Sequence, residues 1–222
     1  METSTLFNLE TFRYPGIFPA ENPWESIKAL PGFLTSNTKV ENLSIQIHPT
    51  AVIEGDVLIG AGTIVDALAI IRGPTIIGKN CYIGRATVRQ VLTGDSCVIG
   101  DRCEVARTIL LDKAIVSHQC TILDTVIGNQ VNIGGGTIIA NVRFDNQPVL
   151  YTFNDKIINS NSNKLGALVG DRAKTGAKAV LMPGSIIGKN SIIGATAFIS
   201  GTVSEGQFVK TTTTIKTVKL NS

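Results

Sequence analysis

From Ile47 onward, aliphatic residues recur every six positions, and most of them are followed by a small or turn-forming residue. A period of six fits neither an amphipathic helix nor a simple alternating strand. It predicts one short strand and one turn per block, with three blocks closing a triangular coil of a parallel β-helix. The blocks begin at Ile47, Ile53, Ile59, Val65, Ile71, Ile77, Ile83, Ile99, Val105, Leu111, Ile127, Ile133, Ile139, Val169, Thr175, Leu181, Ile187, Ile193 and Ile199.

Two side chains of each block are expected to point into the narrow interior of the coil. The leading aliphatic residues form a ladder, and the fifth residue, for example Thr63, Cys81 or Cys103, is small because it also points inward. Glycine at the second position permits the backbone angles of a corner. Repeats of this type resemble the left-handed parallel β-helix family, an exception to the usual right-handed crossover, whose members are mostly acyltransferases acting as trimers. The predicted fold class is therefore all-β, a left-handed parallel β-helix of hexapeptide repeats with an N-terminal arm.

The arm that precedes the repeats holds half of the aromatic residues of the chain. Its segment ENPWESIKALPGF predicts a short helix with Asn22 as N-cap, Pro23 at the first position and Pro31 beyond the end. We expect Trp24 to pack on the first coil or on a neighbouring subunit. The predicted regions are the arm over residues 1–45, the coil over residues 46–205 and a tail over residues 206–222.

A polar insertion, residues 141–165, separates two sets of blocks that share one register. A loop of this length in a regular scaffold is usually functional or disordered. We favour a functional role, because Arg143, Phe144, Tyr151 and Phe153 offer charge together with apolar contact area.

The composition narrows the possible function classes. Of the 222 residues, 43% are apolar and 17% are charged, which is typical of a globular protein. The 20 Lys and Arg residues against 17 Asp and Glu form no basic stripe of the kind that binds nucleic acid. No run of about 18 apolar residues and no secretory segment is present, so we expect a cytoplasmic protein with no membrane partner. The four cysteines show no CxxC pairing, and we expect small buried residues with free thiols.

The stretch AIVSHQCTIL places His118 at the second position of a block, where Gly or Asp is usual. A side chain at this corner points away from the core, so we expect His118 to face solvent or an adjacent subunit. It precedes Asn132 and the glycines at 134–136 by about one coil of 18 residues, which places them beside it. A neutral imidazole can take a proton from an attacking amine, while glycine amides donate to the developing negative charge of a thioester oxygen. The arrangement suits acyl transfer to an amine, with an ordinary surface histidine as the alternative.

Metal catalysis is not expected. The same fold hosts zinc-dependent carbonic anhydrases, which hold their metal with three histidines. This chain has two, His48 and His118, far apart in the sequence, and most cysteines occupy inward positions. We therefore expect His48 to be a surface or capping residue and acetyl transfer to require no metal.

Two segments resemble a specific family: SHQCTILDTVIGNQVNIGGGTIIANVRFD, and KLGALVGDRAKTGAKAVLMPGSIIG at 164–188. They are similar to the C-terminal acetyltransferase domain of the bifunctional N-acetylglucosamine-1-phosphate uridyltransferase and glucosamine-1-phosphate acetyltransferase, in its archaeal-type sugar-phosphate nucleotidyltransferase branch. The resemblance covers residues 22–205 and includes the spacing from His118 to Asn132. No Gly-rich nucleotide loop precedes residue 22, so we expect no uridyltransferase activity.

The resemblance implies a role for each matched position. His118 would be the general base for the 2-amino group of glucosamine 1-phosphate, and Asn132 and Asn141 would contact the sugar or the acetyl group. The acetyl-coenzyme A (acetyl-CoA) site would be lined by Gly135, Ala177 and Ala195. Arg89 or Arg107 would bind the phosphate, because a guanidinium suits phosphate in a bidentate manner, and Arg143 and Lys164 complete the substrate-binding candidates.

We therefore predict an acetyl-CoA-dependent N-acetyltransferase for an amino sugar phosphate, acting as a homotrimer with sites between subunits. Bacterial members carry a lysine and two tyrosines where this chain has Ala106, Thr121 and Val142, and these differences concern phosphate and sugar recognition. Two alternatives stay open. One is a non-catalytic trimeric module that binds a sugar nucleotide or serves regulation, and the other is acetylation of a different amine or hydroxyl acceptor.

Overall fold

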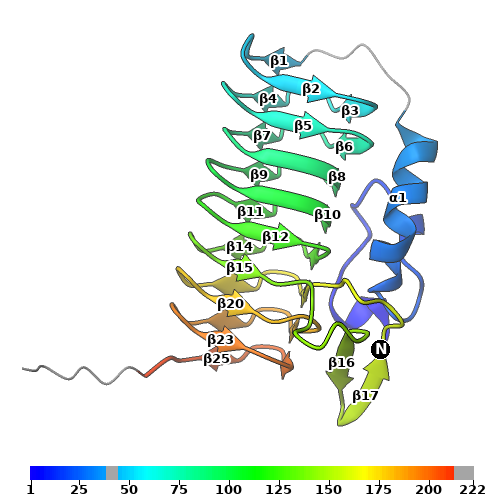
Figure 1. Cartoon of the computed structure of the whole chain (residues 1–222), viewed down its shortest axis with the longest axis vertical. Helices are drawn as coiled ribbons and strands as arrows, with labels where there is room; N and C mark the ends of the chain where they lie inside the picture. The colour runs from blue at the N-terminus through cyan, green and yellow to red at the C-terminus, as the bar shows by residue number, and fades with distance from the viewer. Residues whose placement is uncertain (39–44, 213–222) are drawn as a thin grey trace, which may run out of the picture.

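The chain forms a parallel β-helix whose coils stack along one axis, with the helix α1 and an extended N-terminal segment along one side (Figure 1). The computed structural model describes residues 1–38 and 45–212. The predicted coil of short strands is confirmed. Those parts of the predicted arm and tail at 39–44 and 213–222 lie outside the described residues.

The first face of the coil is a nine-stranded parallel sheet of two-residue strands. In most of them one side chain points outward and the next is buried in the interior. The strands are β1 (Gln46–Ile47), β4 (Ile64–Val65), β7 (Tyr82–Ile83), β9 (Val98–Ile99), β11 (Ile115–Val116), β14 (Asn132–Ile133), β19 (Lys174–Thr175), β22 (Ile192–Ile193) and β25 (Phe208–Val209). Because β25 pairs with β22, the coil continues past residue 205.

The second and third faces form one fourteen-stranded sheet, because β8 (Thr87–Thr93) and β10 (Glu104–Leu110) run around the corner between them. The second face also contains β2 (Val52–Glu54), β5 (Ile70–Arg72), β12 (Thr121–Leu123), β15 (Ile138–Ile139), β20 (Val180–Leu181) and β23 (Phe198–Ile199). The third face also contains β3 (Val57–Ile59), β6 (Thr75–Ile77), β13 (Val126–Ile127), β18 (Leu168–Val169), β21 (Ile186–Ile187) and β24 (Thr202–Val203). In chain order, we call the corner between the first and second faces the first corner, the next the second and the last the third.

The length of a coil is not constant, which corrects the expected spacing of 18 residues. Ile64 pairs with Tyr82, but Ile115 pairs with Asn132, which is 17 residues further on. The second corner is shorter in this middle region, since the strand continues through it. For the same reason the predicted inward position of Leu111 is wrong: Leu110 points into the coil, and Leu111 packs outward against the arm.

The interior consists largely of the predicted ladder. Burial of one such aliphatic side chain stabilises the fold by about 1.5–3 kcal/mol. Ile47 and Ile53 are exceptions and are 45% and 36% exposed, because they lie in the first coil. The four cysteines are buried with free thiols, as expected. His48 is exposed, and its Nδ1 accepts the Thr50 N–H in a local turn, as expected of a capping residue.

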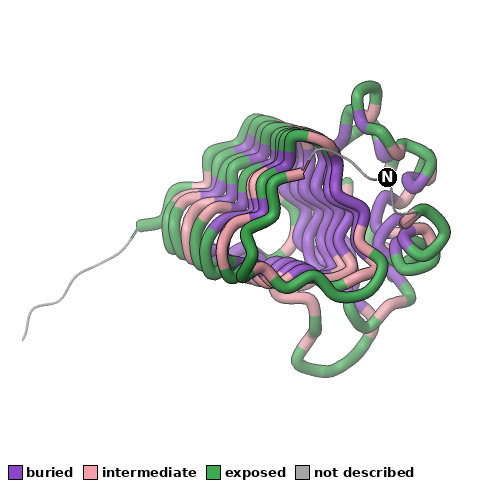
Figure 2. Tube along the Cα trace, turned by 90° about the horizontal axis from the view of Figure 1, so that it is seen from above, coloured by how far each residue is buried: buried purple, intermediate pink, exposed green. Residues whose placement is uncertain are grey.

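The arm covers the third face, where the outward side chains are aliphatic and buried (Figure 2). Its elements are the short 3-10 helices η1 (Thr3–Thr5) and η2 (Pro15–Ile17) and the helix α1 (Glu25–Asn37). The covered residues of the third face are Leu58, Ile76, Leu92, Ile109, Val126, Leu168 and Ile186.

The predicted boundaries of the helix are wrong at both ends. Asn22 has a φ of 60° and precedes a turn, so α1 begins only at Glu25. Pro31 lies inside the helix, where the missing N–H costs about 3 kcal/mol. The helix continues because Leu30 and Leu34 are fully buried against the coil, and this packing outweighs the local cost.

Trp24, expected on the first coil or on a neighbouring subunit, is instead buried within this chain. Its ring stacks on Tyr151 of the insertion, with centroids 4.8 Å apart and an angle of 17° between the planes. The insertion forms a hairpin of β16 (Leu150–Phe153) and β17 (Lys156–Asn159). The arm and the insertion, distant in sequence, therefore share one aromatic contact.

The buried cysteines give a direct test of the coil. Each thiol is at most 2% exposed, so Ellman's reagent should label no thiol in the native protein and four after denaturation. Absorbance at 412 nm before and after adding guanidinium measures both numbers. A thiol that reacts within the mixing time in native buffer would contradict the inward orientation.

Candidate active site

The site begins at the first corner, where one residue from each coil lies in a column with His118. The Gly136 N–H donates to the His118 carbonyl at 2.9 Å, which places Gly135 directly against His118. The Lys178 N–H donates to the Gly135 carbonyl at 2.8 Å, and the Thr196 N–H donates to the Ala177 carbonyl at 2.9 Å. We call the resulting column of His118, Gly135, Ala177 and Ala195 the corner strip.

The corner strip brings together four of the residues that the sequence singled out. The His118 imidazole is exposed, as expected of the corner position. Ala177 and Ala195 are also exposed, and Gly135 carries no side chain, so only small groups follow the imidazole toward the C-terminal coils. An extended, thin molecule can therefore approach the backbone along the strip and end at His118.

Asn132 lies on the adjoining first face rather than in the strip. It pairs with Ile115, three residues before His118, and its side chain is exposed. Of the three glycine amides, the Gly134 N–H donates to the Thr175 hydroxyl and the Gly136 N–H to the His118 carbonyl. This leaves the Gly135 N–H, within the described part of the chain, as the amide able to bind a ligand oxygen.

The candidate phosphate-binding arginines are already paired with carboxylates. Arg89 donates to Glu104 at 2.5 Å on the second face. At the second corner, Arg107 binds both oxygens of Asp124 at 2.6 and 2.7 Å, and this pairing raises the pKa of the guanidinium.

The two candidate cations of the insertion differ. Arg143 pairs with Asp145 in bidentate fashion and holds the pKa of that carboxyl at about 2. It also lines a cavity of about 320 Å³ together with Phe144 and Met182. The Lys164 side chain is exposed and, among the described residues, has no ion pair. Lys164 is therefore the candidate cation that needs no rearrangement to bind a phosphate.

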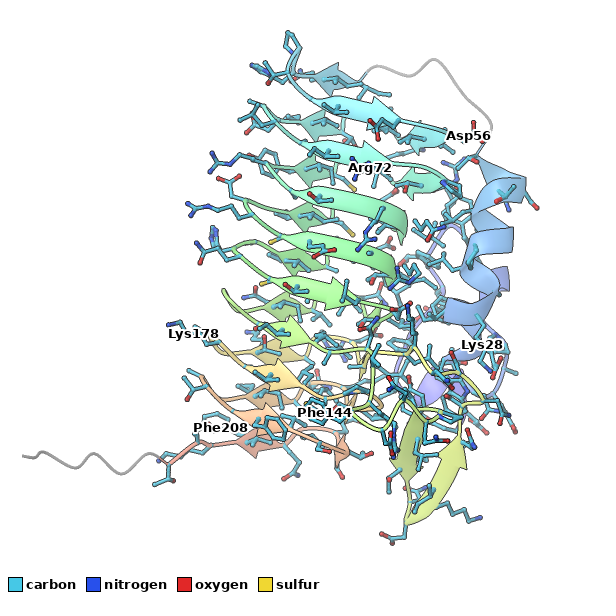
Figure 3. The ribbon with its side chains drawn as sticks, in the orientation of Figure 1. Lys28, Asp56, Arg72, Phe144, Lys178 and Phe208 are labelled. Carbon is cyan, nitrogen blue, oxygen red and sulfur yellow. The ribbon has the colours of Figure 1, made fainter. Side chains whose placement is uncertain are left out.

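Two functional candidates were missed at the sequence level. Lys178 flanks the strip next to Gly136, and Figure 3 shows it at the edge of the coil away from α1. Asp124 is 4% exposed and accepts hydrogen bonds from Arg107 and Asn141. Arg107 lies one coil before Asp124, and Asn141 lies one coil after it. A spacing of 17 between residues 107, 124 and 141 was the signal, but it is visible only once the shortened coil is known.

Neither a metal cluster nor a membrane span is seen in residues 1–38 and 45–212. No three His, Cys, Asp or Glu side chains in these ranges are arranged to hold a metal ion. No helix there has the length and hydropathy that crossing a bilayer requires.

The fold and site define a hexapeptide-repeat protein, and comparisons with known proteins place it further. Residues 71–159 match the family described as GlmU-like, C-terminal hexapeptide, and residues 166–201 match bacterial transferase hexapeptide repeats. The putative uncharacterized acetyltransferase YaiX of Escherichia coli K12 is 30% identical, and the match covers 83% of this chain and 85% of that protein. The chain therefore belongs to the hexapeptide-repeat family of acyltransferases, on its GlmU-like branch.

Longer relatives share the same region. The bifunctional protein GlmU of Methanococcus vannielii is 34% identical, with 94% of this chain and 50% of that protein covered. The bifunctional sugar-1-phosphate nucleotidylyltransferase/acetyltransferase of Sulfurisphaera tokodaii is 31% identical, with 85% and 47% covered. The chain thus spans about half the length of these bifunctional relatives.

A solved structure shows the same fold. The UDP-N-acetylglucosamine acyltransferase of Francisella novicida matches with a TM-score of 0.52 and 14% identity, over 74% of this chain and 67% of that one. The coil is accordingly a left-handed parallel β-helix, as the repeat predicted.

The contact between arm and insertion predicts a large loss of stability on Tyr151→Ala. The side chain is 1% exposed and stacked on Trp24, so its removal should lower the free energy of unfolding by about 3 kcal/mol or more. Emission of Trp24, the single tryptophan, follows the denaturation. Phe144→Ala is the matched control, because this ring of the same insertion is 96% exposed and its loss should cost less than about 0.5 kcal/mol. Equal losses in the two variants would refute the packing described here.

Proposed function

We propose that the chain is an acetyl-CoA-dependent N-acetyltransferase that acts on an amino sugar phosphate such as glucosamine 1-phosphate, with His118 as the general base. The corner strip carries this proposal, because it joins an exposed imidazole to a line of small residues along three further coils. The extended pantetheine arm of coenzyme A fits such a line and would present its thioester at His118. The name of the Sulfurisphaera tokodaii relative includes the words acetyltransferase and sugar-1-phosphate. The first word supports acetyl as the transferred group, and the second supports a sugar phosphate as the acceptor.

The reaction needs one base and one donor. The neutral imidazole of His118 takes a proton from the acceptor amine as its nitrogen attacks the thioester carbon. In this proposal the Gly135 N–H donates to the carbonyl oxygen as that oxygen becomes negative. The carbon–sulfur bond then breaks, the imidazolium returns its proton to the departing thiolate, and the products are an N-acetylated amine and coenzyme A.

We place the working site between copies of the chain in a homotrimer. His118 and Asn141 lie at opposite edges of the second face, so a site that contains both is completed by a second copy. The first and second faces, which the arm leaves uncovered, also carry exposed apolar side chains on both sides of the strip. Beside the strip they include Ile115, Ile192 and Phe208 on the first face and Ile138 and Phe198 on the second.

The alternative of an acceptor other than a sugar phosphate keeps one observation in its favour. Both candidate phosphate-binding cations, Arg89 and Arg107, are paired with carboxylates, as is the substrate-binding candidate Arg143. These pairings do not favour a non-catalytic module that binds a sugar nucleotide, because that ligand also carries phosphate; such a module would bind ligand without turnover.

The proposed base predicts the kinetics of His118→Ala. Loss of general-base catalysis should lower kcat about 100-fold or more, with little change in the KM of acetyl-CoA. Release of coenzyme A thiol, measured with acetyl-CoA and glucosamine 1-phosphate, gives both constants. His48→Ala is the control, since this second histidine lies in the first coil and should leave kcat unchanged. Wild-type turnover in His118→Ala would refute the assigned role.

The strip predicts a separate effect on binding of the acyl donor. Ala177→Leu and Ala195→Leu place a larger side chain on an exposed corner, so the fold should persist while the KM of acetyl-CoA rises about tenfold, the equivalent of about 1.4 kcal/mol. Calorimetric titration with coenzyme A checks the same affinity without turnover. Ala61→Leu, at the third corner, is the matched control and should bind normally. Unchanged affinity in both strip variants would place coenzyme A elsewhere.

A further inference from the structure

The second corner carries a charged node centred on Asp124. Its carboxylate accepts hydrogen bonds from Nε and Nη2 of Arg107, at 2.6 and 2.7 Å, and from Nδ2 of Asn141, at 2.5 Å. The Asp124 side chain is 4% exposed, while that of Arg107 is 28% exposed. Three successive coils thus contribute one side chain each to a single hydrogen-bonded group.

The node fixes which way the Asn141 amide faces. A carboxylate that pairs with a guanidinium is ionised and can only accept hydrogen bonds. The Asn141 group that faces Asp124 must therefore be its NH₂, and the carbonyl oxygen Oδ1 must face the other way. Asn141 is then presented to any ligand as a hydrogen-bond acceptor.

Asn141 is also held by the base of the insertion. The Leu165 N–H donates to the Asn141 carbonyl at 3.0 Å, and the Gly166 N–H donates to the Asp124 carbonyl at 2.8 Å. Both ends of the insertion are thereby joined to the node. Burial and the charge of Asp124 raise the pKa of Tyr151, the ring that stacks on Trp24.

We propose that Asp124 is a positioning residue that holds Asn141 as a hydrogen-bond acceptor at the acceptor end of the site. Asn141 Oδ1 then receives an N–H or O–H group of the amine substrate. Oδ1 itself cannot stabilise the acetyl carbonyl oxygen, because that oxygen needs a donor. This inference rests on the proposed acetyl transfer, and it assigns to the node the recognition of the acceptor rather than of acetyl-CoA.

The polarity can be disrupted and then restored by substitution. In Asp124→Asn, the new amide cannot accept from all three donors, because Arg107 Nε takes one carboxylate oxygen while Arg107 Nη2 and Asn141 Nδ2 share the other. The Asn141 amide then loses the charged acceptor that fixes its orientation. The KM of the acceptor should rise about tenfold, the loss expected for one hydrogen bond, with the KM of acetyl-CoA unchanged. In the double variant D124N/N141D, the carboxylate at position 141 accepts from the amide at position 124 and again presents an oxygen to the ligand. The acceptor KM should then return to within about threefold of the wild type.

Glu54→Gln provides a matched control. Glu54 pairs with Arg72 at 2.7 Å on the second face. Both side chains lie in the first two coils, and each is more than half exposed. This variant should leave both KM values unchanged. Native emission of Trp24 in every variant shows that the arm and insertion remain docked.

The kinetic outcomes decide between a positioning role and a structural one. An acceptor KM that stays at the wild-type value in Asp124→Asn overturns the proposal. A double variant with an acceptor KM as high as that of the single variant also overturns it. The restored carboxylate–amide pair would then have no effect on binding of the acceptor. A matching rise in the KM of acetyl-CoA would move Asn141 to the acyl donor and overturn it as well.

A second measurement separates this proposal from the proposed function. In ¹⁵N-labelled protein, the side-chain NH₂ signal of Asn141, identified by its absence in Asn141→Asp, should exchange slowly with water and shift strongly in Asp124→Asn. This readout needs no substrate, so it stands even if no acetyl transfer to glucosamine 1-phosphate is found. An Asn141 NH₂ that exchanges like an exposed amide and ignores Asp124→Asn would refute the fixed orientation.

Discussion

The structure depends on the hydrogen-bonded register between successive coils. Each coil donates backbone N–H groups to carbonyls of its neighbour, as the Gly136 N–H does to His118, so equivalent positions form columns along the axis. Neighbours in space are then set by position on a face or corner rather than by proximity in sequence. The corner strip is one such column, and the node of Arg107, Asp124 and Asn141 is another.

The arm determines which surfaces remain available for function. The third face carries outward aliphatic side chains that must be covered, and α1 with the preceding segment covers them. The first and second faces stay open, and the first corner between them holds His118. The Trp24–Tyr151 stack joins the arm to the insertion. The arm that covers the third face therefore also contacts the insertion that follows Asn141.

The two corners divide the chemistry of the proposed reaction. The first corner offers an imidazole, a free glycine amide and small residues, which suit a thioester on an extended carrier. The second corner offers ionised and amide groups in a fixed orientation, which suit a polar acceptor. In one chain the width of the second face separates them, and this separation is the physical reason to place the site between copies.

By itself, the sequence determined the coil, its inward ladder and the exposed corner position of His118 beside Gly135, because all of these follow from a local period of six. The period failed where the chain departs from it: the shortened second corner turned Leu111 outward, and burial of α1 overrode Pro31. The pairing of Arg107 with Asp124 and the stack of Trp24 on Tyr151 were decided only by the tertiary structure. Such contacts join segments that no local repeat relates, so their partners are set by how the coils and the arm pack.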